Sequence, residues 1–283
     1  MRFAAAGILT LLVATVAACV RPSAVVRYAE SASRTTEEFP QLAREIHASC
    51  LRVEAYKAQR KSEWYDEVTF RRACATRDTA VFGLIQANDV IAAYLKALAS
   101  IAGNSGASLE PQTGRFVKLL AGKAGFNEPQ ADAAERLAEF VASKSVEGFK
   151  RRELSRVIAA HNADVQTVVS TLLRIVTQDF PSAFNVESTA QDNFYRTSLA
   201  EFGEREPLAA ILVREQRDRR AMELMNKRRA ITSYAAALRR IQSGHQKLYD
   251  ERNHLDAPAL AVELIRAAKE LDSITRELDR AFR

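Results

Sequence analysis

The chain has 283 residues, of which 47% are hydrophobic, and it carries a formal net charge of +6. That hydrophobic fraction excludes a wholly disordered chain, and so small a positive excess does not indicate a nucleic-acid-binding protein. Glycine and proline are few, at 10 and 7, whereas the helix formers Ala, Leu, Arg and Glu are abundant. Composition therefore favours an all-α protein that is long enough to bury a full hydrophobic core.

The first predicted element is a short apolar segment at the N-terminus. An apolar run over residues 3–16 follows Arg2 and ends in the motif Val16-Ala17-Ala18-Cys19. This pattern resembles the signal peptide of bacterial lipoproteins, in which small residues stand directly before a cysteine. The resemblance implies export, cleavage that removes residues 1–18, and diacylation of Cys19 with palmitate-type chains. The mature protein would then be tethered to a membrane.

Other interpretations of this segment remain open. A transmembrane helix needs about 20 apolar residues, and the run is shorter than that. Ordinary signal-peptidase cleavage after Ala18 would give a soluble periplasmic protein, and the segment can also be read as a buried N-terminal helix of a cytoplasmic protein. Within the lipoprotein resemblance, Val20 stands where an Asp commonly retains the protein in the inner membrane. The resemblance therefore implies the periplasmic face of the outer membrane.

Residues 19–34 contain Arg21-Pro22-Ser23 and several small polar side chains, and we expect them to form a short tether. Fifteen extended residues span about 50 Å, so the folded part would lie close to its membrane. Thr35 and Glu38 have the spacing of a capping box, which predicts the start of the first helix there. The helical domain is accordingly expected over residues 35–283.

Cys50 and Cys74 form an even pair once Cys19 is assigned to lipid. Cys50 shares an apolar helical stripe with Ile46, and Cys74 lies at heptad spacing from Val81. In an oxidising periplasm, two cysteines that face one seam from consecutive helices are expected to form a disulfide. The alternative is a pair of buried free thiols.

The middle of the chain shows repeated helical periodicity. A breaker cluster at residues 103–106 and Pro181 punctuate it. Residues 181–204 have the weakest helical pattern, so they are the candidate for a mid-chain connection or hinge. Apolar residues recur at three- and four-residue spacing over five stretches, 39–60, 78–102, 116–125, 127–141 and 154–175.

The final third is expected to form a long helical hairpin. Pro207 suits the first position of a helix that continues to about Asn253. Asp256 then caps a last helix whose apolar stripe runs from Leu260 to Phe282. Because no stretch shows the alternation of a half-buried strand, the sequence predicts an all-α bundle of about six to eight helices.

No catalytic signature occurs in the chain. The motifs of zinc proteases, α/β-hydrolases, P-loop proteins and dinucleotide-binding proteins are all absent from the sequence. The four histidines are widely separated, so we expect no metal site and no cofactor. Asn88 and His161 stand on apolar stripes. Each of them can belong to a polar pocket or to a pH-sensitive packing contact. Alternatively, each is a buried polar group whose hydrogen bonds are satisfied by the protein.

The most unusual charge feature is the segment 214–229, which holds seven arginines and lysines against three acidic residues. Such a segment can face anionic lipid or an acidic partner, or it can be a solvated helix face. The candidate contacts with an anionic surface are Arg219, Arg220, Arg228 and Arg229.

The sequence thus predicts a lipid-anchored helical bundle of the cell envelope that is not an enzyme. Its expected role is an interaction or scaffolding module, with the membrane and an envelope protein as partners and no nucleic acid. The alternative is a lipoprotein that binds a small apolar or amphipathic ligand between its helices. An apolar cavity near Asn88 or His161 would favour the ligand, whereas a filled bundle with an exposed apolar patch would favour the protein partner.

Overall fold

The computed structural model describes residues 21–60, 66–103, 125–147 and 153–282. Within these ranges all regular secondary structure is α-helical, so the prediction of an all-α bundle is confirmed. The seven helices described there fall within the expected number. They are α2 (Arg21–Thr36), α3 (Phe39–Arg60), α4 (Glu67–Gly103), α5 (Glu128–Glu147), α6 (Leu154–Phe202), α7 (Pro207–Asp250) and α8 (Pro258–Phe282).

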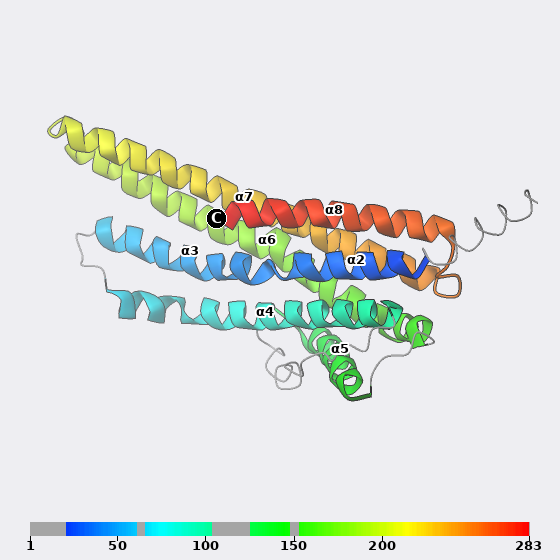
Figure 1. Cartoon of the computed structure of the whole chain (residues 1–283). Helices are drawn as coiled ribbons and strands as arrows, with labels where there is room; N and C mark the ends of the chain where they lie inside the picture. The colour runs from blue at the N-terminus through cyan, green and yellow to red at the C-terminus, as the bar shows by residue number, and fades with distance from the viewer. Residues whose placement is uncertain (1–20, 61–65, 104–124, 148–152, 283) are drawn as a thin grey trace, which may run out of the picture.

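The helices lie nearly side by side in an elongated bundle (Figure 1). α2 and α3 follow one another almost in line, and α4 runs back along both of them. α6 and α7 form the longest hairpin, and α8 returns along α7 and α2. The turn between α6 and α7 projects beyond the ends of the other helices (Figure 1). α5 packs across α4 and α6 at the opposite part of the bundle.

α4 is the central helix of the bundle. By length and composition it is the one helix among the described residues that is apolar enough to cross a membrane. However, 72% of its most apolar window is buried inside the fold, against α2, α3, α5 and α6. Its long apolar stretch is therefore explained by packing on several sides, as expected for a core helix that is hydrophobic nearly all round.

The expectation of a tether over residues 19–34 is wrong for the part that the structure describes. Residues 21–36 form α2, whose buried side chains recur at helical spacing in Val25, Tyr28 and Ala32. Small residues let α2 approach α4 and α8 closely. The free energy gained by burying its apolar side chains there outweighs the weak helical preference of this polar segment. The proposed capping box is also wrong, because Thr35 lies inside α2 and its hydroxyl donates to the Ser31 carbonyl at 2.8 Å.

The mid-chain connection expected within 181–204 lies only at the end of that range, because most of these residues are helical. α6 continues through Pro181 to Phe202, and the turn to α7 follows at residues 203–206. A proline inside a helix costs about 3 kcal/mol because a backbone hydrogen bond is lost. Phe180 and Phe184 flank the proline and are both fully buried, so packing on α3 holds this turn in the helix.

α7 begins at the expected proline, whereas Ala257 and not the predicted cap Asp256 directly precedes α8. Pro207 begins α7 and Pro258 begins α8. The seam between the two helices carries charged pairs, including Lys247 Nζ to Glu263 Oε2 at 3.6 Å and Arg240 with Glu270. The helix expected over residues 116–125 lies almost entirely outside the described residues.

The disulfide between Cys50 and Cys74 is present and joins α3 to α4. Their Cα atoms are 6.0 Å apart, and the bond closes a loop with a sequence separation of 24. Both cysteines are buried, as their positions on apolar stripes predicted. The bond fixes the end of the bundle at which α3 leads into α4.

Candidate interaction surface

The predicted lipidation residue, Cys19, lies outside the described residues. The description starts at Arg21, where α2 begins, at the end of the bundle opposite to the projecting α6–α7 turn (Figure 1). Tyr28 in α2 donates a hydrogen bond to the Ile241 carbonyl of α7 at 2.7 Å, which ties this end of the bundle to the C-terminal half of α7.

Asn88 is completely buried in α4 and is fully engaged by the protein. Its Nδ2 donates to the Thr36 carbonyl at 2.8 Å, and its Oδ1 accepts from the Tyr234 hydroxyl at 2.6 Å. These bonds join α4 to the end of α2 and to α7. The geometry supports a residue that sets helix register, because both ends of the amide are occupied.

His161 in α6 lies under Phe140 of α5, with ring centroids 4.6 Å apart. Its Nδ1 is 3.5 Å from Asp164 Oδ2, beyond a well-formed hydrogen bond. Burial lowers the pKa of His161, and the nearby Asp164 carboxylate only partly opposes that effect. Asp164 instead accepts two hydrogen bonds from Arg136, which docks α5 on α6. His161 and Asn88 have different partners and do not form one pocket.

The sequence did not point to His245, which is the fully buried histidine of the core. Its Nδ1 is 2.9 Å from Asn162 Oδ1, and its Nε2 is 2.8 Å from the Tyr94 hydroxyl. Since an amide oxygen only accepts, Nδ1 carries the proton and Nε2 accepts from Tyr94. Burial lowers the pKa of His245 to about 3, so the ring is neutral at physiological pH. This chain of bonds links α4, α7 and α6 and leaves no reactive nitrogen free.

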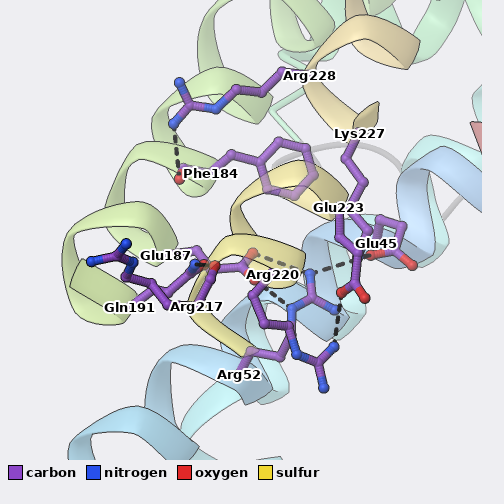
Figure 2. Close-up of polar contacts among 10 residues, drawn as sticks. All are labelled: Glu45, Arg52, Phe184, Glu187, Gln191, Arg217, Arg220, Glu223, Lys227 and Arg228. Carbon is purple, nitrogen blue, oxygen red and sulfur yellow. Dashed lines mark hydrogen bonds and ion pairs between the residues drawn. The ribbon is translucent and has the colours of Figure 1, made fainter. Parts of the chain in front are cut away.

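The basic segment 214–229 does not form a single positive face. Arg219 and Arg220 pair with glutamates on their own helix, at 2.8 Å to Glu215 and 2.8 Å to Glu223 respectively. Arg228 turns to α6, where it donates to the Phe184 carbonyl at 3.3 Å (Figure 2). Of the four arginines proposed for an anionic surface, Arg219 and Arg220 line one common cleft.

Arg229 lies apart from that cleft and contacts its own helix, with Nη2 at 3.9 Å from Met225 Sδ. It lines a separate shallow depression of about 710 Å³ between α7 and the end of α8, together with Arg228 and Arg280. The four candidate arginines are therefore divided between two surfaces.

A partly buried ion-pair cluster holds α3, α6 and α7 together beside the cleft (Figure 2). Arg52 of α3 donates from Nε to Glu187 of α6 at 2.5 Å, and from Nη2 to Glu45 at 3.2 Å. Burial disfavours the charged form of Arg52, but the hydrogen bonds and charges of the two carboxylates outweigh it and raise its pKa. Lys227 of α7 reaches Glu45 at 2.6 Å and completes the cluster.

The cleft itself lies between α3 and α7 and has a volume of about 590 Å³. Aromatic residues of α3 and α6 form its apolar part. The Tyr56 ring is 5.5 Å from that of Phe194 and 6.1 Å from that of Tyr195. Leu212 is 65% exposed on the α7 side. Burial raises the pKa of Tyr56 to about 12, so its hydroxyl is neutral.

Large apolar side chains are also exposed around the projecting α6–α7 turn. Phe202 stands at the end of α6, and Leu208 and Ile211 follow in the first turns of α7. Each is more than half exposed, and Leu208 reaches 79%. Together with Leu212, these residues place four large apolar side chains within eleven positions of the chain. Such a concentration is typical of a contact surface.

Over the described residues, no group of three or more His, Cys, Asp or Glu side chains has the arrangement of a metal site. Comparison with known protein families, curated proteins and solved structures found no match to the chain. The exposed apolar end of the α6–α7 hairpin adjoins the cleft between α3 and α7, since Leu212 belongs to both surfaces.

Proposed function

We propose that this protein is a lipid-anchored, non-enzymatic interaction module on the periplasmic side of the cell envelope, and that it holds a partner protein at the free end of the α6–α7 hairpin. The observation that carries the proposal is the exposure of Phe202, Leu208 and Ile211 at that end. Exposed apolar patches on otherwise well-packed proteins mark sites of association.

The position of the surface agrees with an anchored role. A lipid on Cys19 would sit two residues before α2, whose Tyr28 packs beside Ile241 of α7. Ile241 and Pro207 are separated by 34 residues of one continuous helix. At 1.5 Å per residue, this length is about 50 Å. The anchor and the apolar end would therefore face in opposite directions along the bundle, with the contact surface held away from the membrane.

The alternative role, binding a small ligand between the helices, has less support. The two core positions that suggested a polar pocket are Asn88 and His161. The amide of Asn88 is hydrogen bonded to protein at both ends, and the ring of His161 is covered by Phe140. Neither residue is left with the open apolar space that would favour a ligand.

The proposal is tested by capture of partners from the envelope of the organism after chemical cross-linking of the anchored protein. Leu208→Gln combined with Ile211→Gln should reduce recovery of the partner several-fold and leave the thermal stability unchanged, because both side chains are mostly exposed. Val262→Gln is the matched control, since Val262 is 58% exposed on α8. Equal recovery by the double variant and the control would refute a partner site at this end.

A further inference from the structure

The packing of α8 shows how a helix is held on α7. α8 lies against both α7 and α2, and Thr35 of α2 is hydrogen bonded to Thr275 at 2.8 Å. Acidic residues of α8 recur every seven positions, and each meets a polar side chain that recurs every seven positions on α7. The pairs are Glu263 with Lys247, Glu270 with Arg240, and Glu277 with Ser233.

The described pairs between α8 and α7 reach from Lys247 to Ser233, and α7 extends beyond them. α3 extends the path of α2, and α7 runs on for more than twenty residues towards Pro207 (Figure 1). The next positions at seven-residue spacing on α7 are Asn226 and Arg219. Beyond the bridge from Lys227 to Glu45, the space between α3 and α7 is the cleft of about 590 Å³.

The chemistry of this cleft matches that of the surface which α8 already covers. Its lining combines Tyr56, Phe194 and Leu212 with Arg219, whereas the other two lining arginines, Arg52 and Arg220, are paired with Glu187 and Glu223. Arg219 is paired with Glu215, but both side chains are more than half exposed, at 58% and 62%. An exposed ion pair of this kind contributes little free energy to stability. Arg219 can therefore exchange Glu215 for a carboxylate of another chain at a small cost in free energy.

We propose that the cleft between α3 and α7 binds an acidic amphipathic α-helix of the partner protein, which continues the path of α8. This inference rests on the proposed function and assigns the partner's contacting element. The apolar stripe of that helix would cover Tyr56 and Leu212, and a carboxylate on its flank would meet Arg219, as Glu270 meets Arg240. Helices that lie in apolar grooves are recognised in this way, by an apolar face and flanking charges.

The probe for the test is a synthetic peptide with the sequence of residues 258–282, helix-stabilised by a lactam bridge and labelled with a fluorophore. It carries the acidic heptad spacing that the cleft should recognise. Fluorescence anisotropy measures its binding to the full-length chain. The variant Leu212→Glu with Arg219→Glu should weaken binding by about tenfold or more. Arg239→Glu, on an exposed position of α7 outside the cleft, should leave it unchanged.

A second arm tests the charge. A peptide in which Glu263, Glu270 and Glu277 are replaced by Gln should bind more weakly, and its binding should depend less on salt concentration. Absence of binding to the wild-type chain would overturn the proposal. Equal binding by the cleft variant would also overturn it, because the peptide would then bind outside the cleft.

The result can be separated from the proposed function. If Leu208→Gln with Ile211→Gln abolishes capture of the partner but the cleft variant does not change peptide binding, the partner site at the end of the hairpin stands and the cleft proposal fails. Sedimentation of the purified chain tests whether a second copy of the chain, and not a partner protein, occupies the cleft. A dimer that Arg219→Glu dissociates would assign the cleft to a second copy and overturn the proposal of a partner helix.

Discussion

Replacing Gly244 with alanine tests how α2 is held on α7. A Cβ atom at this position would lie 2.4 Å from Cε2 of Tyr28, 2.6 Å from its Cζ and 2.7 Å from its hydroxyl oxygen. Tyr28 is completely buried, and its hydroxyl donates to the Ile241 carbonyl at 2.7 Å. The ring therefore has no free space into which it can move without losing this hydrogen bond.

The change in the free energy of unfolding caused by Gly244→Ala is the balance of opposing effects. Alanine is favoured over glycine in a helix by about 1 kcal/mol. Overpacking a filled core costs about 1–3 kcal/mol, and a buried hydroxyl left without its acceptor costs about 1–3 kcal/mol more. We expect Gly244→Ala to lower the free energy of unfolding by about 2 kcal/mol. For a chain of this size, that corresponds to a fall in Tm of about 4–8 °C.

Thermal unfolding followed by far-UV circular dichroism measures the effect. Ser243→Ala is the control, because this exposed neighbour gains helix propensity without a new contact. In a Tyr28→Leu background, which removes the three contacted atoms, Gly244→Ala should change from destabilising to stabilising. A Gly244→Ala protein as stable as the wild type would refute the close packing of α2 on α7.

Three further changes have defined outcomes. Replacing Cys50 and Cys74 with serine should lower the free energy of unfolding by about 3 kcal/mol in denaturant titrations and leave the helix content unchanged. Arg52→Met leaves the buried carboxylate of Glu187 unpaired and should cost about 3 kcal/mol by the same measurement, whereas adding Glu187→Leu should recover most of the loss. Because burial lowers the folded-state pKa of His245 to about 3, the unfolded chain binds a proton that the folded protein does not. Stability should therefore fall as the pH decreases from about 6.5 towards 3, and His245→Gln should flatten this decline in urea titrations at stepped pH.

Local sequence signals were sufficient for much of the fold. The apolar stripe of α4, the proline start of α7, and the disulfide between Cys50 and Cys74 all followed from spacing and end signals. These features depend on neighbouring residues or on one pair of consecutive helices, so a single chain reports them directly.

The sequence-based predictions were wrong where tertiary packing outweighs the local secondary-structure preference of a segment. The segment that forms α2 is rich in serine and alanine, which concealed the spacing of Val25, Tyr28 and Ala32. α6 passes through Pro181 because phenylalanines on both sides are buried. In each case long-range burial stabilises a helix that composition or a breaker argued against.

The functional surfaces were harder to anticipate. His245 lies at helical spacing from Ile241 and Leu248, so the apolar stripe of α7 could have indicated its burial. Its partners Asn162 and Tyr94 come from distant helices, which no local pattern reports. The basic segment drew attention to Arg219 and Arg220, but their shared cleft requires side chains from α3 and α6 as well. Such a site exists only once three distant segments have packed together.

Site-specific photo-cross-linking in living cells tests the central claim most directly. A photoreactive amino acid is placed at Leu208, at the free end of the α6–α7 hairpin, and in a matched protein at Val262 on α8. The two residues are both more than half exposed. We expect one discrete protein adduct in the membrane fraction from position 208 and none of that mass from position 262. No adduct at 208, or the same adduct from both positions, would contradict a partner site at this end of the bundle.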